Sequence, residues 1–185
     1  MARALIFFAP GLEECEGLIV VDVLRRSHVD VDIAAVGGDL DVTSSHGVCI
    51  RCDILAEDAD VASYDAVVLP GGMPGTTNLE SSETVRKACL EMDAAGKLVC
   101  AICAAPSALA AFGILKGEDA SVFPSFEGKL EEFGARCTGE QVTEVGNHIT
   151  GQAMGAATLF GLAIASRLAG PADAERVRGA ICYKG

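Results

Sequence analysis

Tryptophan is absent from this sequence, and aromatic residues make up only 5% of it. A folded core must therefore be built mainly from aliphatic side chains and alanine. Half of the 185 residues are hydrophobic, which excludes an intrinsically disordered chain. This length can bury one sizeable core, and we expect a single domain over residues 1–185.

An excess of positive charge is also missing, because the formal net charge is −12. A surface this acidic repels nucleic-acid phosphates and anionic lipid headgroups, so we expect neither a nucleic-acid partner nor a membrane role. The longest uncharged run, residues 149–166, is interrupted by Gly151, Gly155 and Gly161. That run is poor in bulky apolar residues, and it favours a buried helix over a membrane span.

No signal peptide is recognisable, because the apolar stretch at residues 1–9 is short and ends at a Pro-Gly pair. We therefore expect a cytoplasmic location in which the eight cysteines stay free thiols. The pairs Cys49/Cys52 and Cys100/Cys103 have the spacing of a zinc or redox motif. A zinc ribbon holds its pairs much closer in sequence, and Cys100 falls inside a predicted strand, so we expect no metal.

Strand-like apolar segments alternate along the chain with segments of helical periodicity. Predicted strands cover residues 4–8, 29–36, 66–69, 98–102, 121–123, 135–144 and 148–150, with a short strand pair within 42–50. Predicted helices cover residues 14–26, 82–95, 126–133 and 154–168, and a further helix begins at Pro106. This alternation favours an α/β fold with a mainly parallel sheet and helices on both faces.

Functional sites of such sheets lie at the carboxyl ends of the strands. That rule selects the loops that follow the strands ending at Phe8, Leu69 and Ile102. The first loop carries an acidic run, the second a glycine run, and the third a cysteine: Glu13, Glu14 and Glu16; Gly71, Gly72 and Gly75; Cys103 followed by Ala104.

A buried strand runs directly through Cys103 into a helix that starts at Pro106. A nucleophile at such a bend is exposed, and small neighbours such as Ala104 and Ala105 let the backbone turn tightly. The helix start favours a thiolate, and backbone N–H groups at the bend can hold an oxyanion. Taken alone, the segment also fits an inert cysteine packed behind a strand.

Three motifs occur in the order and spacing of one known family: GLEECE at residues 11–16, LPGG at 69–72 and AICAAP at 101–106. With them the chain resembles the ThiJ/PfpI superfamily, in its DJ-one-like branch of deglycase and glyoxalase III-like proteins, from about residue 3 to 170. The resemblance implies a flavodoxin-like three-layer sandwich, usually a homodimer, with a strained nucleophile elbow.

The resemblance also implies roles for individual residues. Cys103 becomes the reactive cysteine, and Glu16 becomes the acid that hydrogen-bonds it. The N–H groups of Gly72 and Ala104 form the oxyanion site, with Gly71 beside them. A protonated Glu16 would stabilise a thiolate, whereas an ionised one would repel it, so we expect Glu16 to titrate high and Cys103 low.

Several positions depart from the family pattern. Relatives offer a histidine directly after the cysteine or before a later proline, where this chain has Ala104 and Phe123. Residues 152–154 (Gln-Ala-Met) replace an Arg-Gly-Pro stretch that lines the pocket in relatives. His46 stands where relatives have an arginine near the dimer contact, and we weigh it as an accessory group from a neighbouring subunit. Cys15 is weighed as a resolving cysteine.

The resemblance implies a cofactor-free thiol enzyme, a glyoxalase III- or deglycase-like hydro-lyase or hydrolase, that converts methylglyoxal, glyoxal or glycated substrates to hydroxy acids. The first alternative is an oxidative-stress sensor or chaperone-like protein that acts through oxidation of Cys103. A weaker one is an amidase or peptidase, which lacks its histidine base. Residues 71–75 lack the Gly-Lys-Ser/Thr ending of a phosphate loop, so we expect no nucleotide cofactor.

Overall fold

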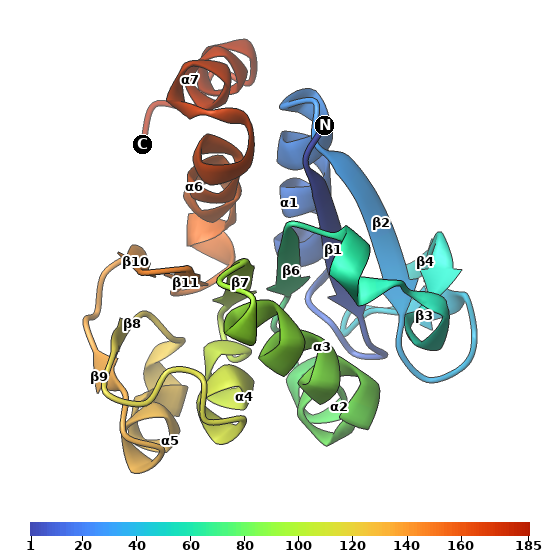
Figure 1. The fold of residues 1–185 in the computed structure, drawn as a ribbon, viewed down its shortest axis with the longest axis vertical. Helices are drawn as coiled ribbons and strands as arrows, with labels where there is room; N and C mark the ends of the chain where they lie inside the picture. Colours follow the sequence, from blue (N-terminus) through green and yellow to red (C-terminus); the bar gives the residue numbers. More distant parts are fainter.

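The computed structural model describes all residues from Met1 to Gly185. Its centre is a seven-stranded sheet in the order β10-β11-β7-β6-β1-β2-β5 (Figure 1). The strands are β1 (Arg3–Phe8), β2 (Asp30–Ala35), β5 (Ile54–Leu55), β6 (Ala66–Leu69), β7 (Leu98–Ile102), β10 (Val142–Val145) and β11 (His148–Gly151). All neighbouring strands pair in parallel except β10 and β11, which form an antiparallel hairpin at one edge.

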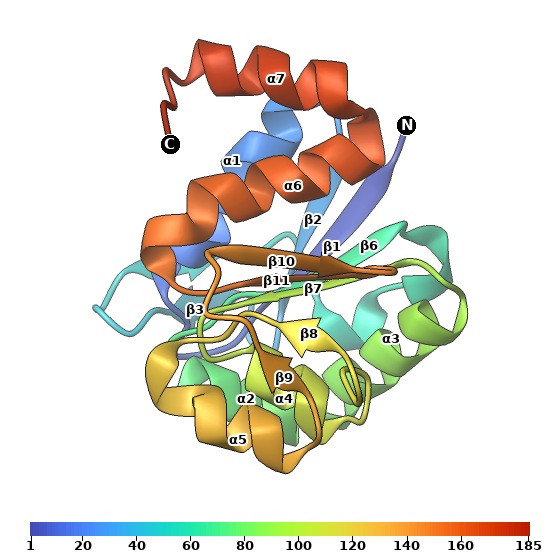
Figure 2. The ribbon, with the colours of Figure 1, turned by 90° about the vertical axis from the view of Figure 1, so that its left-hand side faces the viewer.

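Helices cover both faces of this sheet (Figure 2). On one face lie α1 (Glu14–Arg26), α6 (Ala157–Ala169) and α7 (Pro171–Ala180). On the other lie α2 (Gly75–Ser81), α3 (Glu83–Ala94), α4 (Pro106–Ala111) and α5 (Glu127–Glu132). The predicted α/β sandwich with a mainly parallel sheet is therefore confirmed.

Shorter elements complete the fold. Two small sheets are formed by β3 (Asp41–Thr43) with β4 (Cys49–Arg51), and by β8 (Asp119–Ala120) with β9 (Arg136–Cys137). Single 3₁₀ turns cover Ala56–Asp58, Val61–Ser63, Pro124–Phe126 and Met154–Ala156. No helix combines the length and the apolar character that a membrane span requires.

The alternation of side chains along each strand builds two separate aliphatic cores. In β1, Ile6 and Phe8 pack toward α1 and α6, whereas Leu5 and Phe7 pack toward the helices of the other face. All four side chains are fully buried. A strand buried on both faces reads as a continuous apolar run, which explains why β1, β6 and β7 were recognisable from sequence.

Helix ends follow the local chemistry of the chain. The Glu13 carboxylate caps α1 by accepting the N–H of Glu16 at 2.7 Å. Ser82 caps α3 by accepting the N–H of Val85 at 3.3 Å. The first of these caps fixes the start of α1, and with it the backbone that carries Glu16.

Some predicted elements are wrong. Residues 121–123 are not a strand, because β8 ends at Ala120, and residues 135–144 form two strands, β9 and β10, rather than one. The final helix is followed by another, α7, because Gly170 adopts φ 95° and Pro171 then opens a new helix. Helix α2 and strand β5 had no clear periodic signal and were missed.

Candidate active site

The three loops selected from sequence meet at one edge of the sheet. Strands β1, β6 and β7 are consecutive neighbours, so their carboxyl ends lie side by side (Figure 1). The Glu13 N–H donates to the Gly71 carbonyl at 2.9 Å, which ties the first loop to the second. A Cβ on Gly71 would lie 2.6 Å from the Cys103 Cβ, so the second loop passes too close to Cys103 for any larger residue.

Cys103 sits on a left-handed bend. Its φ is 65°, a value that few residues other than glycine adopt and that costs conformational energy. The Cys103 N–H donates to the Gly151 carbonyl at 2.9 Å, and its carbonyl accepts the Phe123 N–H at 2.8 Å. These bonds hold the strained bend from both sides, and the residue is only half-buried. The sharp elbow expected at this position is present.

Two backbone donors converge on the sulfur. The N–H groups of Gly72 and Ala104 both donate to the Cys103 thiol and lower its pKa. These are the two groups expected to hold an oxyanion. A donor pair that stabilises negative charge on sulfur can also stabilise charge on an oxygen bonded to the neighbouring carbon.

Glu16 lies beneath this bend and is 1% exposed. Its Oε2 accepts the Gly71 N–H at 2.9 Å. Its Oε1 is buried and makes no hydrogen bond, although the carboxyl group lies close enough to the Cys103 thiol for that contact to lower the pKa of Glu16. A protonated Oε1 would satisfy itself by donating to the sulfur.

Burial dominates the acid–base behaviour of this pair. Burial raises the pKa of Glu16 to about 7, against the opposing hydrogen bonds from Cys103 and Gly71. The high titration of Glu16 expected from sequence is thus supported. Burial also raises the pKa of Cys103 to about 12, with the negative charge of Glu16 as the next cause.

A low pKa of Cys103 was expected only beside a protonated Glu16, and an ionised Glu16 was expected to repel the thiolate, so the low pKa beside the neutral acid stays a prediction. Two of the causes that raise the Cys103 pKa, the charge of Glu16 and the hydrogen bond to it, depend on that ionisation. Protonation of Glu16 removes the charge and turns the contact into a donated hydrogen bond. The two groups are coupled, and the thiolate forms only when the acid is neutral.

This coupling predicts a pH-dependent stability. The pKa of Glu16 rises from 4.5 to about 7 on folding, so the folded chain holds a proton that the unfolded chain releases, and stability falls as pH rises through this window. Replacing Glu16 with glutamine should remove that loss. We expect urea unfolding of Glu16→Gln to gain on the order of 3 kcal/mol relative to the unsubstituted protein between pH 4.5 and 8.

The control for that measurement is Glu91→Gln, which changes an exposed carboxylate on α3. It should follow the pH dependence of the unsubstituted protein. A Glu16→Gln variant whose stability runs parallel to the unsubstituted protein from pH 4.5 to 8 would contradict a buried, neutral acid.

The remaining sequence-predicted residues lie differently. Gly71 gives its N–H to Glu16, so it positions the acid and is not a free oxyanion donor. His46 is exposed, and its Nδ1 lies 3.1 Å from Glu14, so a role across a dimer contact stays a prediction. Cys15 lines a cavity of about 410 Å³ with Ile181 and Tyr183 on the outer side of α1.

The departures from the family pattern are close to the cysteine. Phe123 donates its N–H to the Cys103 carbonyl, so the position that carries histidine in relatives does border the bend. Gln152 turns its side chain toward the Gly139 carbonyl at 3.1 Å. Met154 is 51% exposed. No histidine side chain hydrogen-bonds Cys103: His148 is buried between Asp93 and Glu118, at 2.8 and 2.6 Å, and is structural.

Sequence reasoning missed two supports of the site. The Glu13 carboxylate caps the helix that carries Glu16, but glutamate is not among the usual N-cap residues, so no standard capping signal indicated it. The carbonyl of Gly151 holds the Cys103 N–H from a strand far along the chain. No local signal could have revealed that contact.

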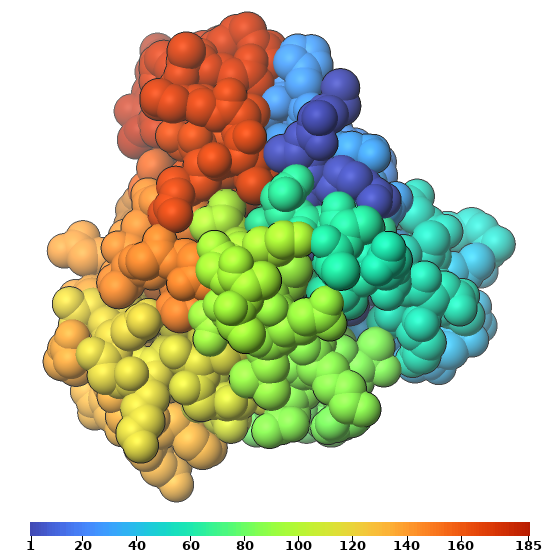
Figure 3. Space-filling view, in the orientation of Figure 1, coloured from blue at the N-terminus to red at the C-terminus, as the bar shows by residue number.

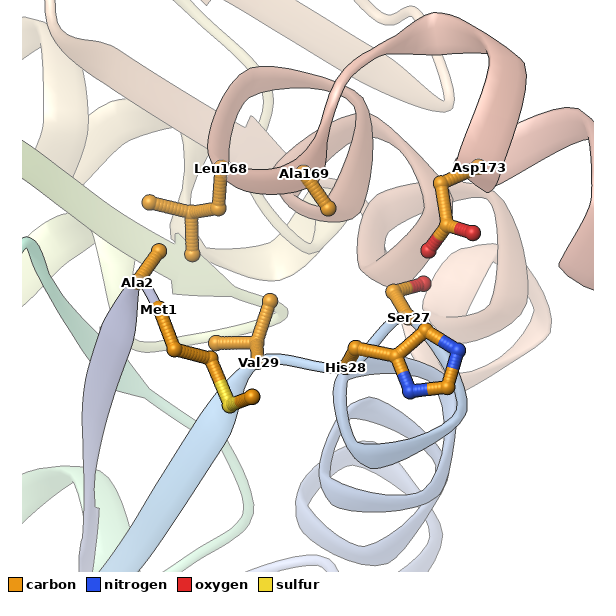
Figure 4. Close-up of a pocket in the computed structure, with 8 residues that line it drawn as sticks. All are labelled: Met1, Ala2, Ser27, His28, Val29, Leu168, Ala169 and Asp173. Carbon is orange, nitrogen blue, oxygen red and sulfur yellow. The ribbon is translucent and has the colours of Figure 1, made fainter.

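Other parts of the surface do not carry equivalent chemistry. The structure has 5 surface cavities, and Cys103 lines none of them. One of about 340 Å³ lies where the chain's first residues meet the end of α6, and it contains Ser27, His28 and Asp173 (Figure 4). In the space-filling view, the dark-blue N-terminal residues lie beside the red C-terminal helices (Figure 3). Asp173 is already paired with Arg176 at 2.7 Å.

One group of side chains has the composition of a metal ligand set. Potential ligand atoms of Glu13, Glu14 and His46 all lie within 4.8 Å of one another. His46 is exposed, and one Glu13 oxygen already accepts a hydrogen bond from the Glu16 N–H.

All eight cysteines are free, and Cys52 and Cys100 are buried.

Known proteins share this fold and sequence. The model of the DJ-1/PfpI family matches residues 2–167. Protein dj-1beta of Drosophila melanogaster is 36% identical over 174 residues, 94% of this chain and 93% of its own. Its crystal structure superposes with a TM-score of 0.96 at 34% identity, covering 100% of this chain and 99% of that one. The glutathione-independent glyoxalase DJR-1.2 of Caenorhabditis elegans is 29% identical over 180 residues, 97% of this chain and 95% of its own.

Proposed function

Because the chain belongs to the DJ-1/PfpI family, we propose that it is a cysteine-dependent enzyme that converts small 2-oxoaldehydes to hydroxy acids without glutathione. Methylglyoxal and glyoxal are the proposed substrates, with glycated adducts as a further class. The similarity to a glutathione-independent glyoxalase supports this reaction type. We propose further that the enzyme is a cytoplasmic homodimer that needs no cofactor.

One observation carries the proposal. A half-buried thiol at a left-handed bend receives two backbone N–H bonds, and a buried carboxyl group with a pKa of about 7 lies beside it. A pKa near neutrality is what a group needs to act as both acid and base at physiological pH. Buried pairs with perturbed pKa values are typical of catalytic sites.

The proposed reaction begins on sulfur. The Cys103 thiolate attacks the aldehyde carbon, a C–S bond forms, and the carbonyl electrons move to oxygen. The N–H groups of Gly72 and Ala104 stabilise that oxyanion. Protonated Glu16 then gives its proton to the oxyanion, which leaves a neutral hemithioacetal and a carboxylate.

The same carboxylate then moves the proton that defines the reaction. Ionised Glu16 removes the hydrogen from the former aldehyde carbon, which leaves an enediolate with the negative charge on the ketone oxygen. Glu16 returns the proton to the neighbouring carbon, and the hydroxyl proton on the first carbon passes to the charged oxygen. The product is a thioester of the 2-hydroxy acid. Water attacks the thioester and gives one proton to the Glu16 carboxylate, the C–S bond breaks, and the hydroxy acid leaves with the Cys103 thiolate and the protonated Glu16 restored. The sum is methylglyoxal plus water giving lactate, with no net oxidation.

The test is lactate release from methylglyoxal by purified protein in buffer without thiols. We expect turnover that persists after dialysis against a chelator and does not increase when glutathione is added. A rate equal to that of heat-unfolded protein would refute the proposal. The effect of removing each catalytic group is taken up in the Discussion.

A second candidate function rests on the same sulfur. Cys103 is a half-buried thiol in contact with two N–H donors and a protonatable acid, and these groups can hydrogen-bond the oxygens of a sulfinate. A peroxide-sensing role predicts that mild hydrogen peroxide adds two oxygens to Cys103 before any other cysteine, as read by peptide mass. Buried Cys89 provides the internal comparison. First oxidation at another cysteine would exclude the sensor.

A further inference from the structure

Three exposed large apolar side chains lie on backbone segments that adjoin the proposed nucleophile. The exposed residues of this kind are few: Met1, Leu18, Val48, Met73, Phe123, Phe133 and Met154. Met73, Phe123 and Met154 are 50%, 41% and 51% exposed, and all three lie on segments that hydrogen-bond to Cys103. Exposed apolar side chains that cluster at one place commonly mark a binding surface.

The backbone ties each of these side chains to the thiol. Met73 directly follows Gly72, whose N–H donates to the Cys103 sulfur. Phe123 donates its own N–H to the Cys103 carbonyl at 2.8 Å. Met154 opens the 3₁₀ turn that comes just after Gly151, whose carbonyl accepts the Cys103 N–H. We call Met73, Phe123 and Met154 the apolar rim.

Charge around the thiol points to the same kind of ligand. The three segments that carry the apolar rim, residues 70–78, 121–126 and 149–158, contain no Asp, Glu, Lys or Arg, although 22% of the chain is charged. The charges nearest in sequence to the acid of the site are Glu13 and Glu14. These three segments therefore offer no cation for a phosphate or carboxylate, and the acidic groups of the first loop repel one.

From these observations we infer that the enzyme selects neutral 2-oxoaldehydes that carry a hydrocarbon group, such as an aryl or branched alkyl glyoxal, over methylglyoxal and over anionic aldehydes. The inference rests on the proposed function and specifies its substrate class. The aldehyde carbon meets the sulfur, and the hydrocarbon group lies against the apolar rim. Apolar contacts of this size change specificity by tenfold or more.

The experiment compares kcat/KM for phenylglyoxal and methylglyoxal in the unsubstituted protein and in Phe123→Ala, Met154→Ala and Phe133→Ala. We expect a phenylglyoxal preference of at least about tenfold, reduced about fivefold or more by Phe123→Ala. Phe133→Ala is the matched control, because Phe133 is 38% exposed, directly follows α5 and does not lie on any of the three segments that carry the apolar rim. It should leave the preference unchanged.

A second readout separates this inference from the proposed function. Alkylation of Cys103 by N-phenylmaleimide and N-ethylmaleimide, each normalised to a free thiol in solution, reports the apolar rim without turnover. The protein could turn over neither aldehyde and still be alkylated preferentially by N-phenylmaleimide, with Phe123→Ala removing that preference. This outcome would refute the proposed function but support the apolar rim as a binding surface. Turnover with no phenyl preference in either assay would overturn the inference and keep the enzyme.

The apolar rim has one competing occupant, a second copy of the chain. Sedimentation of Met73→Ala and Phe123→Ala distinguishes the two. Unchanged assembly together with a reduced phenyl preference supports the substrate site. Dissociation to monomers without a change in preference would assign these side chains to an interface and overturn the inference.

Discussion

Replacing Cys103 with alanine should abolish lactate release from methylglyoxal, with a loss of at least about 10³-fold. In the proposed mechanism the sulfur forms and breaks the only covalent bond to substrate, so no other group can take its place. Alanine keeps the Cβ at the left-handed bend and removes only the thiol, so folding should be nearly unaffected. The measurement is steady-state turnover beside urea unfolding of the same preparation.

Cys137→Ala is the matched control. Cys137 is also half-buried and free, and burial likewise raises the pKa of its thiol, but it lies in β9 rather than at the elbow. That variant should keep full activity. If the Cys103→Ala protein is folded and retains more than a tenth of the turnover, the Cys103 thiol is not the nucleophile.

Glu16→Gln should lower turnover by about 10²- to 10⁴-fold. Glutamine fills the same space and can still donate a hydrogen bond, but it cannot carry a proton between the two carbons of the substrate. The same substitution should have the opposite effect on the reactivity of the Cys103 thiol, which should increase. The charge that raises the Cys103 pKa disappears, so the pKa of the thiol should fall and alkylation by iodoacetamide at pH 7 should be faster.

This divergence distinguishes a proton carrier from a group that merely activates the thiol. Slow turnover with fast alkylation supports Glu16 as the acid–base group. Slow turnover with equally slow alkylation would mean that Glu16 serves only to produce the thiolate. Glu14→Gln is the control, because Glu14 is next but one in the chain and contacts His46 instead of Cys103. It should change neither rate.

Prediction from sequence succeeded where the signal was local. Strand β7 and helix α1 have the predicted boundaries, because continuous apolar runs and a clear helical period set them. A buried strand that leads into a proline-started helix indicated a bend at Cys103, and the family resemblance implied its strained elbow. Helix α2 was not predicted because its local signal is weak: its glycine and threonines give no strong helical preference. Its start depends instead on a hydrogen bond from the Gly75 N–H to the Gly11 carbonyl, which lies far away in the sequence.

The sequence alone therefore determined the alternation of the main strands and helices, and it identified three loops that must share one edge of a parallel sheet. Only the tertiary structure decided the chemistry at that edge. Burial sets the pKa of Glu16 and Cys103, the Gly71 N–H goes to the acid, and Cys15 faces a different cavity. Local patterns encode backbone conformation, whereas a pKa depends on how much water and charge surround a group, and those surroundings come from residues distant in the chain.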